Sequence, residues 1–280
     1  MAPVLADTSS RWGDLTLRVL SAAVLLPVAI FCVWAGGWWF ILLTVALSVG
    51  LATEWVTLCG FRVSAWPGYL LPGLIGVAGI AASFQGPAVG LLVLAGGVIA
   101  ITADAYRPVP FRRRVWLAAG FPYFGIAAIA LPWLRADPVA GLANTLFILF
   151  VIWGSDIGAY ATGRMVGGPK LAPSISPGKT WSGAIGGLMG AVLSGFGIAA
   201  CLSSPFLPSD VTILAIGLGL AAQAGDLLES ALKRHFGVKD SGHIIPGHGG
   251  LLDCLDSLVV VAPIAAVVAL YLGRGVVLWR

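Results

Sequence analysis

The sequence predicts an all-α, polytopic transmembrane protein, and both its composition and its apolar stretches indicate this class. Apolar residues make up 59% of the 280 residues and charged residues only 10%, and the mean hydropathy is +0.97. Soluble globular domains carry about 25% charged residues. Apolar stretches of roughly 18 residues or more, long enough to cross a bilayer core as a helix, also recur along the whole chain.

About nine of these stretches are predicted to be transmembrane helices. The first is too long for a secretory signal and is followed by further stretches, so we expect it to be retained. The third and fourth are rich in glycine and proline, and tryptophans near the ends of the early stretches suit the membrane interface. The predicted helices cover residues 19–35, 38–58, 67–84, 87–104, 115–134, 142–160, 183–202, 211–229 and 255–272.

The distribution of positive charge predicts the orientation of these helices. With the N-terminus in the cytoplasm, all but three of the 16 lysines and arginines fall on the cytoplasmic side, the exceptions being Arg135, Arg274 and Arg280. This positive-inside bias predicts a cytoplasmic N-terminus and an external C-terminus. It also places two long polar loops, 161–182 and 230–254, in the cytoplasm, where nucleotides are found.

The remaining composition argues against other classes of protein. The topology accounts for the net charge of +4, so this charge gives no reason to expect a nucleic-acid partner. The four cysteines lie in or beside apolar stretches without CxxC spacing, so neither a disulfide nor a zinc site is predicted. Membrane lipids are the partners that the composition itself indicates.

The polar residues divide the chain into three predicted regions. Residues 1–105 form a transmembrane scaffold, residues 106–140 a middle segment with a basic cytoplasmic loop, and residues 141–280 a catalytic region containing both long polar loops. From Trp153 onward, carboxylates appear at the predicted membrane edge, where ionisable groups are costly and indicate function. They are Asp156, Asp226, Glu229, Asp253 and Asp256.

Two pairs of carboxylates have the spacing of a shared metal site. Asp226 and Glu229 are three residues apart, as are Asp253 and Asp256, so each pair lies on one face of a helix. The first pair is expected to close the eighth helix and the second to open the ninth. A few carboxylates together with substrate phosphates suit Mg²⁺. Alternatively the acids only complement helix dipoles, which fits the second pair but not the first.

A glycine turn and its neighbouring cations indicate a phosphate site. The segment 247–250 reads Gly-His-Gly-Gly and directly precedes a predicted helix, so its backbone N–H groups could face an anion. Lys233, Arg234 and Lys239 flank this turn, which favours phosphate binding over a plain loop. His235 and His243 have no such surroundings and are interpreted as interfacial loop residues.

The other polar loop is predicted to hold substrate phosphates as well. Its Ser-Pro-Gly-Lys-Thr segment at 176–180 lacks the upstream glycines and the strand of a P-loop. Hydroxyl groups and lysines near a helix start can bind phosphates without that fold. In the seventh helix, glycines four apart at 183/187 and 186/190 predict close packing, which we expect against the helices that bear the carboxylates.

These residues resemble the phosphatidate cytidylyltransferases (CDP-diacylglycerol synthases). The C-terminal signature of that family is matched at Ser230, Lys233, Arg234, Lys239, Asp240, Pro246, His248, Gly249, Gly250, Asp253 and Asp256. A second family segment is matched at Asp156, Gly158, Ala159, Tyr160, Ser176, Pro177, Lys179 and Thr180. Two positions depart from the family pattern: Cys254 stands where arginine is usual, and Ser182 stands where an acidic residue is common.

The resemblance implies transfer of the CMP moiety of CTP to phosphatidate, with Mg²⁺ and an optional second cation, in a bacterial-type inner membrane. The active site would face the cytoplasm, and a homodimer is expected from the family. The expected metal ligands are Asp226, Glu229, Asp253 and Asp256. Further catalytic residues would be Lys233, Arg234, Lys239, Asp240 and His248. Substrate would be bound by Asp156, Lys170, Ser174, Ser176, Lys179, Thr180, Ser230, Gly249 and Gly250.

Two other functions fit parts of the sequence. A CTP-dependent polyprenol or phytol kinase would use similar phosphate-binding groups, but its neutral hydroxyl nucleophile would require a general base. A secondary transporter would also carry carboxylates in glycine-interrupted helices. It would place them near the bilayer midplane and show an internal repeat, whereas the acids here cluster at one face and no repeat is visible.

Overall fold

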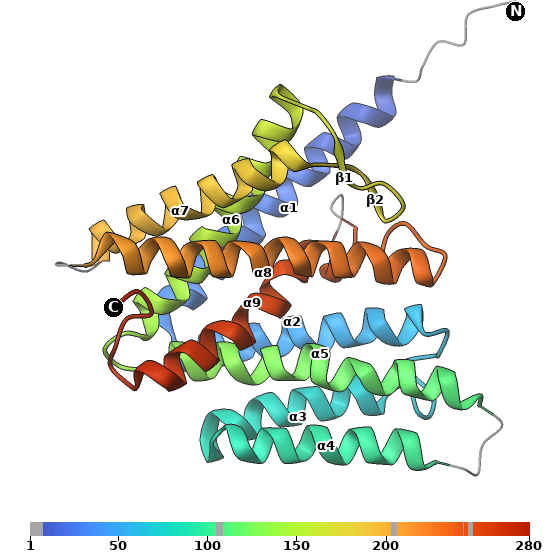
Figure 1. Ribbon diagram of the computed structural model, residues 1–280. Coiled ribbons are helices and arrows are strands. Elements are labelled where there is room, and N and C mark those ends of the chain that lie inside the picture. Colours follow the sequence, from blue (N-terminus) through green and yellow to red (C-terminus); the bar gives the residue numbers. More distant parts are fainter. Residues whose placement is uncertain (1–7, 105–108, 203–205, 243, 246–248) are drawn as a thin grey trace, which may run out of the picture.

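A computed structural model describes the chain except for residues 1–7, 105–108, 203–205, 243 and 246–248, and except for the side chains of residues 8–20 and 22. Within the described part the protein is mostly helical, which confirms the predicted all-α class (Figure 1). The helices are α1 (Thr8–Ala35), α2 (Gly37–Leu58), α3 (Leu70–Gln85), α4 (Pro87–Ala103), α5 (Phe111–Arg135), α6 (Gly141–Met165), α7 (Trp181–Leu202), α8 (Pro208–His235) and α9 (Leu251–Leu272). A short antiparallel hairpin of β1 (Lys170–Ala172) and β2 (Ser176–Thr180) lies between α6 and α7.

Among the described residues, fewer helices have the length and hydropathy of a membrane span than the nine predicted. In the described residues, α2 and α5 to α9 are long and apolar enough to cross a membrane. Helices α3 and α4 have 16 and 17 residues, which is about 24–26 Å of helix against a bilayer core of about 30 Å. They pack together as a hairpin that reverses at Gly86, whose φ is 95°. The hairpin returns to the side of the membrane where it began. The orientation of α5 to α9 is therefore the same whether or not α3 and α4 cross the whole bilayer.

Two large apolar cores and one small cluster hold the helices together, and α9 belongs to both large cores. The first core, built mainly from α2 to α5, includes the fully buried Trp55 and Phe121. The second, built mainly from α6 to α9, includes Phe147, and it is closed by the C-terminal Trp279, which stacks on Phe147. The start of α9 contributes Leu252 to the first core, while its later turns pack in the second. Helix α9 therefore joins the N-terminal region to the predicted catalytic region.

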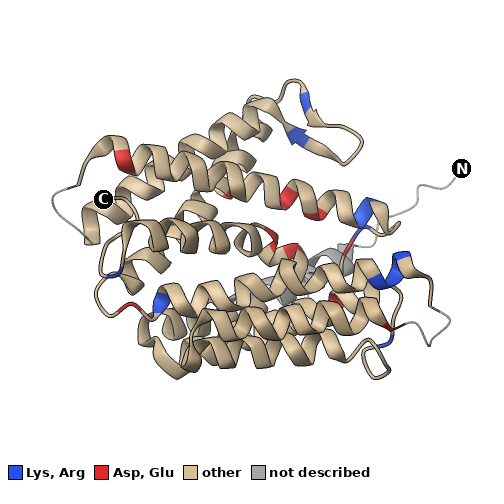
Figure 2. Cartoon of the chain, turned by 60° about the horizontal axis from the view of Figure 1, so that its bottom comes forward, with Lys and Arg blue, Asp and Glu red and all other residues tan. Residues whose placement is uncertain are grey.

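The two long polar loops are shorter than predicted. Helix α6 continues to Met165 and the β-hairpin fills most of the rest of 161–182, while α8 continues to His235. Asp226 and Glu229 therefore lie within α8 and do not close it. The helix extends because Lys233 pairs with Glu229 one turn earlier, and because the cations of its last turn complement the helix dipole. Charged residues are otherwise few along the helices (Figure 2).

Glycines bring α6 and α7 into backbone contact. A β-carbon added at Gly158 would collide with the carbonyl oxygen of Gly186, and one added at Gly190 would collide with that of Gly154. Helix α7 packs against both α6 and α8, which carry Asp156 and Asp226. The close packing predicted from the glycine spacing is thus confirmed, and its partners are the helices that bear the carboxylates.

Replacing Gly158 with valine is expected to force α6 and α7 apart and to lower the melting temperature. Overpacking costs about 1–3 kcal/mol, which corresponds to a fall in Tm of roughly 3–10 °C. Thermal unfolding in detergent measures the effect. Gly197→Val on α7 is the matched control, because a β-carbon there meets nothing within 4 Å. Equal losses in both variants would contradict the packing interpretation.

Candidate metal and phosphate site

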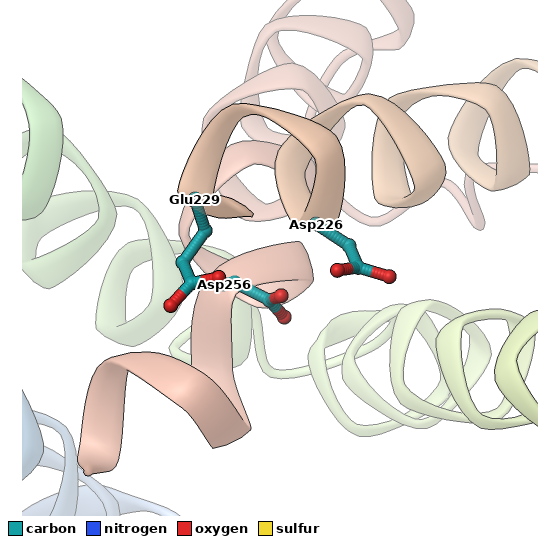
Figure 3. A group of neighbouring side chains, drawn as sticks. All are labelled: Asp226, Glu229 and Asp256. Carbon is teal, nitrogen blue, oxygen red and sulfur yellow. The ribbon is translucent and has the colours of Figure 1, made fainter. Parts of the chain in front are cut away.

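Three carboxylates from two helices converge on one point. Asp226 and Glu229 project from α8 and Asp256 from α9, and each offers an oxygen atom that lies within 4.8 Å of the others (Figure 3). The helices approach closely because residue 225 is glycine, where a β-carbon would lie 2.9 Å from the carbonyl oxygen of Asp256. Oxygen ligands in this number, with room left for water or phosphate, fit Mg²⁺.

Asp253 lies outside this cluster and holds the start of α9. Its carboxylate accepts hydrogen bonds from the backbone N–H groups of Gly250 at 3.0 Å and Ser241 at 3.1 Å. It also forms an ion pair with Lys233 at 2.7 Å. These are the contacts of a carboxylate in the first turn of a helix, the alternative that the sequence left open for this pair. The structure therefore brings three of the four predicted metal ligands together.

Lys233 connects the carboxylate cluster to the start of α9. Its ammonium group lies 2.8 Å from Glu229 Oε1 and 2.7 Å from Asp253 Oδ1, and its side chain is 15% exposed. The side chain of Glu229 is only 2% exposed. A lysine held between two largely buried acids primarily neutralises them, because an unpaired buried charge is costly.

A pocket of about 620 Å³ adjoins the cluster and has the size of a small-molecule site. It is bounded by α6, the β-hairpin, α7 and α8, and Asp156, Lys179, Thr180 and Asp226 are among its lining residues. Lys179 on β2 forms an ion pair of 2.6 Å with Asp226 on α8. Asp226 is thus shared by the pocket and the carboxylate cluster, so a molecule in the pocket would reach a metal bound there.

The remaining predicted residues occupy different surroundings. Thr180 accepts a hydrogen bond from the N–H of Gly183 and so caps α7. The guanidinium group of Arg234 lies 3.3 Å from the carbonyl oxygen of Ile175 and ties α8 to the hairpin. Ser230 is half-buried on α8, Ser176 is half-buried on β2, and Lys170, Ser174, Lys239 and Asp240 are exposed. His248 lies outside the described residues.

The start of α9 differs most from the expectation. Its first N–H groups were predicted to face a phosphate, but they are used by carboxylates of the protein itself. The N–H of Gly250 donates to Asp253, and those of Leu251 and Leu252 donate to Glu54 on α2. A phosphate bound by Gly249 and Gly250 could not use these donors. Glu54 was missed, although a single acid inside an apolar stretch is itself a signal of function.

Comparison with known proteins gives relatives over nearly the whole length. Residues 16–272 match the model of the "Cytidylyltransferase family". A phosphatidate cytidylyltransferase of Brucella suis biovar 1 (strain 1330) is 38% identical over 256 residues, which cover 89% of this chain and 91% of the relative. One from Rickettsia bellii (strain RML369-C) is 32% identical over 267 residues, which cover 90% of this chain and 89% of the relative.

Proposed function

The chain belongs to the cytidylyltransferase family, and on that premise we propose that it transfers the CMP moiety of CTP to phosphatidate, giving CDP-diacylglycerol and pyrophosphate. The observation that carries the proposal is the shared position of Asp226. It belongs both to the three-carboxylate cluster and to the wall of the 620 Å³ pocket, where Lys179 pairs with it. Long apolar helices around this site make the chain an integral membrane protein, so the site can receive a lipid substrate from the surrounding bilayer.

The proposed chemistry is an in-line displacement at phosphorus. A phosphate oxygen of phosphatidate attacks the α-phosphorus of CTP, a new P–O bond forms, and the bond to the bridging oxygen of the leaving pyrophosphate breaks. The nucleophile is already an anion, so no strong general base is required. The protein must instead position two polyanions and offset their repulsion.

The residues of the site supply that positioning. Asp226, Glu229 and Asp256 would hold Mg²⁺, which when bound neutralises phosphate charge and stabilises the leaving group. Lys179 is placed to exchange its partner Asp226 for a phosphate of CTP in the pocket. Lys233 pairs with Glu229 at 2.8 Å and so restrains its side chain beside the cluster.

The orientation of the site follows from the same proposal. CTP is a cytoplasmic molecule, so the ends of α8 and α9 that carry the carboxylates would face the cytoplasm of a bacterial-type inner membrane. The positive-inside distribution of lysine and arginine supports this orientation. A homodimer stays a prediction based on the family.

Purified protein with phosphatidate and CTP labelled at the α-phosphorus tests the function. We expect the label to enter the lipid, with one pyrophosphate released per transfer, and we expect chelation of divalent metal to abolish the reaction. Label from the γ-phosphorus in the lipid would instead identify a lipid kinase. Absence of any nucleotide-dependent lipid product would contradict both.

A further inference from the structure

A buried glutamate of the N-terminal region reaches the predicted catalytic region. Glu54 lies on α2 and is only 3% exposed. Its carboxylate accepts hydrogen bonds from the N–H of Leu251 at 2.8 Å and from the N–H of Leu252 at 2.9 Å. The hydroxyl of Ser241 lies 3.1 Å from Glu54 Oε2. The contact therefore joins positions nearly 200 residues apart in the sequence.

The surroundings of Glu54 accommodate a buried carboxylate. Within the described residues it forms no ion pair with lysine or arginine, so its burial is offset by hydrogen bonds and by the positive end of the α9 dipole. The backbone closes tightly on the carboxylate. A β-carbon at Gly242 would lie 2.6 Å from Oε1, and one at Gly250 would lie 2.7 Å from Oε2. Glycine at both positions admits the carboxylate.

A continuous polar chain runs from Glu54 to the carboxylate cluster. The Ser241 hydroxyl lies 3.1 Å from Glu54 and 3.1 Å from Asp253, and it can donate its proton to either. Asp253 pairs with Lys233, and Lys233 pairs with Glu229 of the cluster. The same contacts fix the first turn of α9, and Asp256 follows one turn later.

We propose that Glu54 is a positioning residue for the metal site. By fixing the first turn of α9, it sets the rotation and depth at which Asp256 faces Asp226 and Glu229. The catalytic consequence rests on the proposed function, but the effect on metal affinity can be measured without substrates. Misplacement of a reacting group by about 1 Å can cost roughly 100-fold in rate.

The test variant is Glu54→Gln, which keeps the size of the side chain but turns one acceptor into a donor facing a backbone N–H. Binding of Mn²⁺ by the purified protein, measured by electron paramagnetic resonance in the absence of substrates, is the first readout. We expect the variant to bind Mn²⁺ about 5- to 50-fold more weakly. The Mg²⁺ concentration that half-saturates CMP transfer should rise by a similar factor.

Asp137→Asn is the matched control. Asp137 lies between α5 and α6, near the C-terminal end of α9, and accepts hydrogen bonds from the N–H groups of Val139, Ala140 and Gly275. Burial alone would raise the pKa of Asp137, but these N–H groups and the nearby Arg274 hold it below its usual value. The control therefore also removes a charged carboxylate that caps backbone groups. We expect it to lower Tm but to change Mn²⁺ affinity less than twofold.

The outcomes separate the inference from the proposed function. Equal Mn²⁺ affinity in Glu54→Gln and the wild type would overturn the positioning role, whatever happens to Tm. Weakened Mn²⁺ binding in Glu54→Gln, together with a wild-type protein that transfers no CMP, would support the positioning role and contradict the proposed function. If Glu54→Gln does not fold, Ser241→Ala removes only the hydroxyl link, and it should weaken Mn²⁺ binding about 2- to 5-fold. Unchanged binding in that variant would count against the inference.

Discussion

Replacing Asp256 with asparagine is expected to lower CMP transfer by about 1,000-fold or more. Asp256 is the only member of the three-carboxylate cluster that comes from α9. Without its charge, the α8 pair loses the ligand that closes the site. Metal stabilisation of phosphoryl charge contributes several kcal/mol, and each 1.4 kcal/mol corresponds to about tenfold in rate. The measurement is conversion of α-labelled CTP, together with Mn²⁺ binding.

Two further aspartates make this experiment specific. Asp210→Asn changes an acid in the first turn of α8, far from the cluster, where its carboxylate pairs with Ser209; activity should stay within about twofold. Asp253→Asn should lower Tm, because Asp253 holds the start of α9, and should weaken Mn²⁺ binding less than Asp256→Asn does. Loss of Mn²⁺ binding in Asp253→Asn with full binding in Asp256→Asn would reverse the assignment of the two residues.

The sequence predicted the parts of this protein that depend on local pattern. Long apolar stretches predict helices in a membrane, and a three-residue spacing places two acids on one helix face wherever the helix packs. Asp226 and Glu229 therefore emerged as a pair from spacing alone. The extension of α8 to His235 was missed because the predicted end followed the apolar stretch, although Glu229 and Lys233 have the i,i+4 spacing that stabilises a helix.

The different surroundings of Asp253 and Asp256 could not be predicted, because both residues satisfy the same spacing. What separates them is the neighbour that each meets after folding. Asp256 faces α8 where residue 225 is glycine, whereas Asp253 turns toward Ser241 and Lys233. The use of the α9 start by Glu54 depends on a contact between α2 and α9 that no local pattern records.

Replacing Lys233 with methionine is expected to destabilise the protein strongly and to abolish activity. The substitution leaves Glu229 and Asp253 without their shared cation. Removing one partner of a buried ion pair costs about 3–5 kcal/mol, which corresponds to a fall in Tm of roughly 10 °C for a chain of this size. Thermal unfolding and CMP transfer are measured on the same preparations.

The double variant Lys233→Met with Asp253→Asn decides what Lys233 does. If the lysine acts by neutralising the two acids, removing one of those charges should restore at least half of the lost Tm and part of the activity. If it instead binds a substrate phosphate, as the sequence pattern predicted, stability should return while activity stays at the level of the single variant. Because its ammonium group already contacts two carboxylates at 2.7 and 2.8 Å, we expect the first result. Recovered stability without recovered activity would support the predicted role of Lys233 in phosphate binding.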